Sequence, residues 1–276
     1  MFKYLAYPKV PTLMRFCAVV ILASLLLALV IKARQSIPEV VVETMPVEEE
    51  VFVSLIPDFD AITNIEMKKQ SFFAFLHQYV DAENKLILQT REYLQVFSDI
   101  VSRDMDLSPT EQQTLDTIAS EYKLQDSGLN NAEMVEELLV RVDVIPVSLA
   151  LAQAATESAW GTSRFAREGN NIFGQWCYDE GCGLVPGRRA RDASHEVRAF
   201  SSIEASVRGY FRNLNTNPSY EYLRELRAQM RLKGRSLDAL ALAHGLTRYS
   251  ERGHVYVTEV QEIIRINDLL SRDEQS

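Results

Sequence analysis

The chain has 276 residues, of which 47% are hydrophobic, and a formal net charge of −9. This length leaves room for one large domain or two small ones, and a composition without a low-complexity tract excludes a mainly disordered chain. The charge is uneven, because residues 35–143 carry 7 basic and 22 acidic side chains, whereas residues 144–276 carry 17 basic and 16 acidic ones. With neither a basic stripe nor a known binding motif, nucleic acid is not an expected partner.

The N-terminus is a candidate membrane segment. Phe16–Ile31 is a nearly unbroken apolar run of 16 residues. That length lies between the roughly 7 to 15 residues of a signal-peptide core and the about 20 of a bilayer span. The next residues, 32–34, are not a small-x-small cleavage site. We therefore predict that residues 1–34 anchor the chain in the inner membrane with the rest in the periplasm; export after signal cleavage is the alternative. Residues 35–57, with three prolines, are predicted to be a linker.

Residues 58–143 have the pattern of a helical extension. Apolar side chains recur at three- and four-residue steps over 61–101, which predicts a long helix. Ser108-Pro109-Thr110-Glu111 has the pattern of a capping box with proline at the first helical position, so a helix is expected from there to Tyr122. Asn131 is expected to cap another helix that ends near residue 141. The sequence does not identify a partner for this extension, although an envelope protein would fit it.

Residues 144–276 predict helices interrupted by a small lobe. Pro146–Gly161 is an apolar helical stretch. Between 170 and 200, glycine and proline break the helical pattern, and Val197–Phe200 alternates like a strand. Further helices are expected over 202–213, 221–232, 236–243 and 257–269, the third capped by Ser236. The predicted fold is therefore mainly α, of the α+β kind, with a helical domain that carries a small β and loop lobe.

Two cysteines close a short loop in this lobe. Cys177 and Cys182 flank Gly181, and a disulfide between them is sterically plausible. Such bonds persist in oxidising compartments, which agrees with a periplasmic location. A zinc site is the weaker alternative, because the nearby histidine is His195 alone and there is no second cysteine pair. We predict no metal.

Glu157 stands near the end of the apolar helix. Ala150 and Ala154 lie seven and three residues before it, on the same helical face. A carboxylate at the end of such a face is expected to be partly desolvated, which raises its pKa and suits a general acid near neutral pH. The alternative is an ordinary solvated glutamate at the end of a helix.

Three stretches combine polar groups with aromatic rings that can stack on sugars: Glu157–Gly161, Asn170–Trp176 and Tyr249–Tyr256. They contain A-x-E-S-x-W-G at Ala155–Gly161 and N-x-F-G at Asn171–Gly174. With these motifs the second half of the chain resembles the catalytic domain of bacterial glucosaminidases of the peptidoglycan-hydrolase type, including the flagellar muramidase-like proteins. Further matches are Phe200–Ser202, Asn217–Tyr220, and Gly245 followed by Tyr249 and Tyr256.

The resemblance implies a lysozyme-like catalytic domain over 144–276 that cleaves the β-1,4 bond after N-acetylglucosamine in peptidoglycan glycan strands. It implies that Glu157 is the general acid and that Tyr249 lines the cleavage site. The substrate-binding positions that we infer beside them are Trp160, Asn171, Phe173, Gln175 and Tyr256. No cofactor is needed, because two acid/base groups suffice for this chemistry.

The second catalytic group is less clearly marked. Relatives place a glutamate in a longer β-hairpin, whereas here residues 184–199 are short and basic. Of the candidates Asp179, Glu180, Asp192 and Glu196, we choose Glu196. A substrate-assisted route, in which the 2-acetamido oxygen replaces the second carboxylate, is also open, and neither retention nor inversion is predicted.

Two other functions are compatible with the sequence. A lytic transglycosylase also uses a single glutamate in an E-S context, but those enzymes usually continue with G-L-M-Q, whereas Phe173–Trp176 reads F-G-Q-W. A non-catalytic envelope protein that binds glycan in the same cleft is the second alternative, because the hairpin glutamate is missing.

Overall fold

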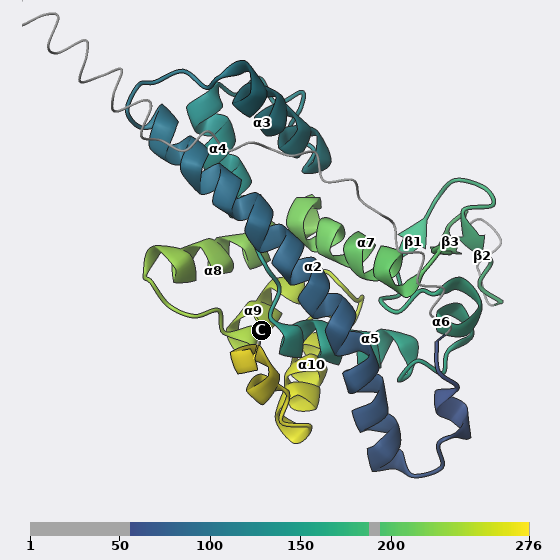
Figure 1. Cartoon of the computed structure of the whole chain (residues 1–276). Coiled ribbons are helices and arrows are strands. Elements are labelled where there is room, and N and C mark those ends of the chain that lie inside the picture. Colours follow the sequence, from purple (N-terminus) through teal and green to yellow (C-terminus); the bar gives the residue numbers. More distant parts are fainter. Residues whose placement is uncertain (1–55, 188–193, 276) are drawn as a thin grey trace, which may run out of the picture. The chain divides into compact units, whose positions relative to one another are not determined.

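Helices make up most of the structure, a computed structural model that describes residues 56–187 and 194–275 (Figure 1). The described elements belong to one compact unit, Glu50–Ser276. The predicted anchor over 1–34 and all but the last two residues of the predicted linker lie outside the described residues. Within residues 56–187 and 194–275, no helix is long and apolar enough to cross a membrane.

The first half forms the helices that its periodicity and caps predict. A short 3-10 helix, η1 (Phe59–Ala61), precedes the 37-residue helix α2 (Ile65–Val101). Helices α3 (Pro109–Glu121) and α4 (Asn131–Arg141) each begin with a capping box. The cap predicted for α4 was wrong by one position. Asn130 caps it, because the Asn130 side chain accepts the backbone N–H of Glu133 while the Glu133 carboxylate accepts that of Asn130.

The remaining helices begin at residue 147. In chain order they are α5 (Val147–Ser158), α6 (Arg164–Gly169), α7 (Ile203–Thr216), η2 (Pro218–Tyr220), α8 (Glu221–Leu232), α9 (Ala239–Leu242), η3 (Ala243–Leu246), α10 (His254–Ile266) and η4 (Leu269–Gln275). Two predicted starts were wrong. Asp238 rather than Ser236 caps α9, because its carboxylate accepts the backbone N–H groups of residues 240 and 241. Helix α10 begins at His254 rather than Val257, so Tyr256 lies in its first turn.

The predicted small β lobe lies between α6 and α7. Its three short strands are β1 (Trp176–Cys177), β2 (Gly183–Leu184) and β3 (Glu196–Arg198). They pair antiparallel in the order β1-β3-β2, with Trp176 and Leu184 both opposite Val197. The fold is therefore mainly α with a small sheet, as predicted.

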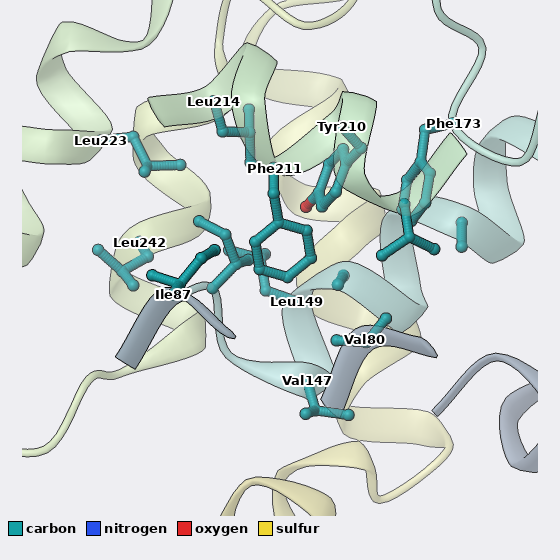
Figure 2. Packing of buried hydrophobic residues seen from close by; sticks show 14 of the residues in the cluster. Val80, Ile87, Val147, Leu149, Phe173, Tyr210, Phe211, Leu214, Leu223 and Leu242 are labelled. Atoms are coloured by element: carbon teal, nitrogen blue, oxygen red, sulfur yellow. The ribbon is translucent and has the colours of Figure 1, made fainter. Parts of the chain in front are cut away.

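Helix α5 lies inside the core. Every residue from Val147 to Ala155 is buried, as expected for a helix that is apolar on all sides. It packs against α2, α10 and η4. Figure 2 shows Val147 and Leu149 of α5 in one cluster with Val80 of α2 and Phe211 of α7. Burial of one such side chain stabilises the folded state by roughly 1.5–3 kcal/mol. A helix with this many buried side chains is held firmly in place, so α5 is a rigid support for its last turn.

A buried charge cluster ties the two halves together at the predicted boundary near residue 143. Arg231 donates to both oxygens of Asp143, at 2.7 and 3.0 Å. Arg227 is fully buried and donates to the backbone carbonyls of residues 140, 141, 143 and 144. Arg91 of α2 donates to the carbonyl of Val142 at 2.8 Å. Burial alone would raise the pKa of Asp143, but these guanidinium groups hold it below its ordinary value. The division into domains at residue 143 stays a prediction.

Candidate active site

Glu157 occupies the last turn of α5. Its side chain is half-buried, and burial raises its pKa above the ordinary value. The expected desolvation of this carboxylate is therefore confirmed. The helix ends immediately after it, because Ala159, Trp160 and Gly161 have φ angles of 50°, 61° and 77°. Left-handed residues other than glycine cost of order 1–3 kcal/mol each and cluster at functional sites.

Gly174 brings the backbone of another loop against the Glu157 carboxylate. A Cβ atom placed on Gly174 would lie 2.8 Å from Oε2 of Glu157, and the glycine has a φ of +63°. Both facts require glycine here, because a side chain would meet the carboxylate and would strain a left-handed backbone. The glycine of the N-x-F-G motif thus makes room for Glu157.

A chain of buried hydrogen bonds ends at Tyr256, which lies near Glu157. The amide nitrogen of Gln153 donates to the Tyr256 oxygen at 2.9 Å, and the hydroxyl of Tyr210 donates to the Gln153 oxygen at 2.8 Å. Burial raises the pKa of Tyr256, so this phenol remains a proton donor. Burial is the largest effect on the pKa of Glu157, and the nearby Tyr256 hydroxyl acts in the opposite direction by lowering it. The chain fixes the position of the Tyr256 hydroxyl, and the sequence did not single out Gln153 or Tyr210.

Stacked aromatic rings support this chain. Phe173 stacks on Tyr210 with ring centroids 3.9 Å apart, and Tyr249 stacks on Tyr256 at 5.6 Å. The half-buried Tyr249 also donates its hydroxyl to the backbone oxygen of Phe173 at 2.8 Å. Tyr249 therefore contacts Tyr256, which in turn lies near Glu157.

Two charged residues of the C-terminal region act on Glu157. Arg252 forms an ion pair with Glu259 and lies over the ring of Tyr256, 5.6 Å from its centroid. The charge of Arg252 lowers the pKa of Glu157 and that of Glu259 raises it. Sequence analysis missed Glu259. The signal was its position one turn after Tyr256 on a helix, which brings both to the same side.

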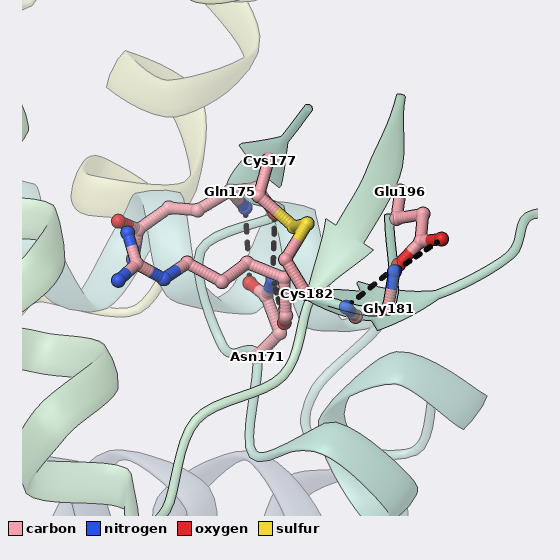
Figure 3. Close-up of a disulfide and its surroundings, with 8 residues drawn as sticks. Asn171, Gln175, Cys177, Gly181, Cys182 and Glu196 are labelled. Carbon is pink, nitrogen blue, oxygen red and sulfur yellow. Dashed lines mark hydrogen bonds between the residues drawn. A yellow bond between two sulfur atoms is a disulfide. The ribbon is translucent and has the colours of Figure 1, made fainter. Parts of the chain in front are cut away.

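Several residues predicted to bind substrate have contacts that position the site. Asn171, Phe173 and Tyr256 are buried, and their roles in substrate binding stay predictions. Asn171 donates to the backbone oxygens of Gln175 and Arg198, both at 2.8 Å, and accepts the N–H of Gln175 (Figure 3). It therefore shapes the loop that carries Gly174.

The other two predicted substrate contacts are half-buried. Gln175 donates from its side chain to the backbone oxygen of Ser206 at 3.0 Å. Trp160 packs edge-on against Phe73, with ring centroids 5.2 Å apart, and the ammonium group of Lys69 lies 5.2 Å from its ring. Both retain exposed surface, and their roles in binding stay predictions.

The Cys177–Cys182 disulfide is present, with the two Cα atoms 6.2 Å apart. Glu196 fastens the same loop, because its two carboxylate oxygens accept the backbone N–H groups of Gly181 at 3.2 Å and Gly183 at 2.8 Å (Figure 3). A buried carboxylate engaged at both oxygens is suited to holding a loop, and the catalytic role of Glu196 stays a prediction.

Three other acidic residues were candidates for the second carboxylate. Asp179 and Glu180 are exposed on the Cys177–Cys182 loop, and Asp192 lies outside the described residues. Within the described part of the chain, the group that brings three metal-ligand atoms together is Cys177, Cys182 and Glu196. Its sulfur atoms are bonded to each other, so the thiolates that a metal would require are absent.

Comparison with known proteins identifies the family. Residues 132–269 match the glucosaminidase family model, described as mannosyl-glycoprotein endo-beta-N-acetylglucosaminidase. The chain is 36% identical over 205 residues to protein Bax of Escherichia coli strain K12, which covers 74% of this chain and 71% of that protein. The crystal structure of the catalytic domain of the autolysin Auto from Listeria monocytogenes aligns with a TM-score of 0.36 and 18% identity, covering 63% of this chain and 94% of that domain. The matched range begins in α4 and includes Glu157, Gly174 and Tyr256. Together with the identity to protein Bax, this match shows that the chain belongs to the glucosaminidase family.

Proposed function

We propose that the protein is a peptidoglycan hydrolase of the endo-β-N-acetylglucosaminidase type, with Glu157 as its general acid. The observation that carries this proposal is the environment of Glu157: a carboxylate with a raised pKa on a rigid helix, held between the Gly174 backbone and the Tyr256 hydroxyl. A raised pKa keeps a carboxylic acid protonated at the pH where it must donate. Family membership supports a glycosidase, and the resemblance to peptidoglycan hydrolases supports the glycan strands of the cell wall as substrate.

The reaction follows from the chemistry of the glycosidic bond. Glu157 donates its proton to the oxygen that links N-acetylglucosamine to the next sugar, and the bond from that oxygen to the anomeric carbon breaks through an oxocarbenium-like transition state. Water then supplies hydroxide to the anomeric carbon, and its remaining proton restores the acid. The nearby Tyr256 hydroxyl stabilises Glu157 after it has lost its proton, when the carboxylate is negative.

A substrate-assisted route suits this site, because Glu196 is committed to the loop. In that route the 2-acetamido oxygen of the substrate attacks the anomeric carbon, and Glu157 activates water in the second half. We further propose that the N-terminal segment holds the enzyme on the inner membrane with this site in the periplasm. The apolar run and the disulfide support that location.

The test is digestion of purified cell-wall sacculi by the full-length protein in detergent. We expect fragments that end in reducing N-acetylglucosamine. Glu157→Gln should lower the rate by about 10²- to 10⁴-fold, the usual contribution of a general acid. Glu225→Gln is the matched control, because Glu225 is exposed on α8, and it should retain full activity. Wild-type activity in Glu157→Gln would refute the assignment.

The same assay separates the alternatives. A lytic transglycosylase would leave anhydro-muramic ends, and mass spectrometry would find products lighter by one water. A non-catalytic glycan-binding protein would bind sacculi and release no product from them.

A further inference from the structure

Two exposed aromatic side chains lie in β1 and in the loop that follows it, outside the contacts around Glu157. Trp176 is 54% exposed and Tyr178 is 69% exposed, although both are large and apolar. The ring of Trp176 stacks on that of His195 with centroids 4.1 Å apart and an interplanar angle of 13°. We call Trp176, Tyr178 and His195 the aromatic platform.

The register of the sheet brings Trp176 and His195 together. Trp176 lies opposite Val197, and His195 is two residues before Val197. Since side chains alternate across a strand, residues two apart point to the same side. Tyr178 lies beyond the end of β1, in the loop that the disulfide closes. Cys177 and Glu196 pair on the opposite face, where they hold the loop.

The platform is rigid at its base. The disulfide closes the loop that contains Tyr178, and Glu196 accepts backbone N–H groups from the far side of that loop (Figure 3). Asn171 joins the start of β1 to β3 through the backbone oxygens of Gln175 and Arg198. Exposed rings on a fixed base lose little conformational freedom when a ligand binds, which favours affinity.

The platform is also close to the acid along the chain. Gly174 packs against the Glu157 carboxylate, and Trp176 is two residues further on. Because two residues span at most about 7 Å, Trp176 begins within a short reach of the bond that Glu157 would protonate. The backbone of Trp176 therefore lies close to the Glu157 carboxylate.

We propose that the aromatic platform is a glycan subsite, in which Trp176 and Tyr178 stack on the pyranose rings of the strand beside the cleavage point. This inference rests on the proposed function. The C–H face of a β-linked sugar is apolar and flat enough to cover an aromatic ring, while the indole N–H and the phenol O–H at the ring edges can donate to hydroxyl and acetamido oxygens. The loop that carries Gly174 packs against Glu157 and continues directly into Trp176. This continuity favours a sugar strand over a protein as the occupant.

The test measures binding without turnover. Full-length Glu157→Gln protein would be titrated calorimetrically with an oligomer of β-1,4-linked N-acetylglucosamine. Added to that background, Trp176→Ala should weaken binding about tenfold, as truncation of a buried aromatic anchor does. Trp176→Phe should recover most of the affinity, because it keeps a ring. Tyr222→Ala is the matched control, since Tyr222 is also 54% exposed but lies on α8, and it should leave binding unchanged.

Tyr178→Ala keeps the proposal testable if Trp176→Ala disturbs the sheet, because Tyr178 lies beyond the strand and is mostly exposed. It should also weaken binding several-fold relative to Tyr222→Ala. Equal affinity in all of these variants would overturn the subsite while leaving the hydrolase intact. A wild-type protein that binds through Trp176 but releases no product would overturn the hydrolase while leaving the subsite intact.

Discussion

Replacing Gly174 by alanine tests whether the position of Glu157 controls activity. The new methyl group would lie 2.8 Å from Oε2 of Glu157, whereas ordinary contact begins at 3.4 Å. The carboxylate must therefore move by more than half an ångström, which also changes its position relative to the Tyr256 hydroxyl. The substitution also places an L-residue at a φ of +63°.

The expected effects follow from these two facts. A left-handed conformation costs an L-residue about 1–2 kcal/mol, which should lower the melting temperature by roughly 2–8 °C in a chain of this size. A misplacement of about 1 Å at a reacting group can lower the rate about 10²-fold. We therefore expect kcat to fall by about 10- to 100-fold, well beyond what the loss of stability explains at a temperature where the variant is folded.

Gly128→Ala is the matched control. Gly128 has a similar φ of +72°, but an added Cβ would meet nothing within 4 Å. It should lower the melting temperature by a similar amount and leave hydrolysis of sacculi unchanged. If Gly174→Ala loses no more activity than Gly128→Ala, then contact with the Glu157 carboxylate does not control the reaction and the reasoning is wrong.

Three other predictions use different parts of the molecule. Glu259→Gln removes a negative charge that raises the pKa of Glu157, so the alkaline limb of the pH–rate profile should move to lower pH; an unmoved limb would contradict this coupling. Asp143→Asn leaves buried guanidinium groups without their counter-charge and should lower the free energy of unfolding by about 3–5 kcal/mol in urea titrations. Because the pKa of Asp143 is lower in the folded state, the charged carboxylate stabilises the fold at pH values above its ordinary pKa of 3.8. This stabilisation is lost as the pH falls through the lower pKa of the folded state. The variant should therefore lose less stability than the wild type in acid. In cells, Cys177 and Cys182 should resist alkylation until a reductant is added; free thiols there would count against a periplasmic location.

The elements of the fold were largely predictable because their signals are local. Periodicity over 61–101 and the capping box at Ser108 each involve residues within a turn or two of one another. The errors also had local causes. Asn130 and Asn131 are both suitable caps, and Glu133 decides between them because it lies three residues after Asn130 and completes a capping box with it. The start of α10 was missed because Gly253 and His254 carry no strong cap signal.

The candidate site was predictable only in part. Glu157 and Gly174 were found because their motifs are short, and the structure places them in contact. The loop contacts of Glu196 could not be predicted, because its partners, the backbone N–H groups of Gly181 and Gly183, carry no side-chain signature. Glu259 was missed because no motif connects it with Glu157, which lies on another helix.

By itself the sequence determined which segments are helical, which glutamate stands at the end of an apolar helix, and which cysteines can pair, because each depends on near neighbours in the chain. The tertiary structure decided which other carboxylate acts on the acid, which tyrosine hydroxyl lies near it, and which rings remain exposed. Those properties depend on the packing of α5 against α10 and of β1 against β3. Burial and hydrogen bonding between such distant segments set the pKa of Glu157, and no single stretch of sequence encodes them.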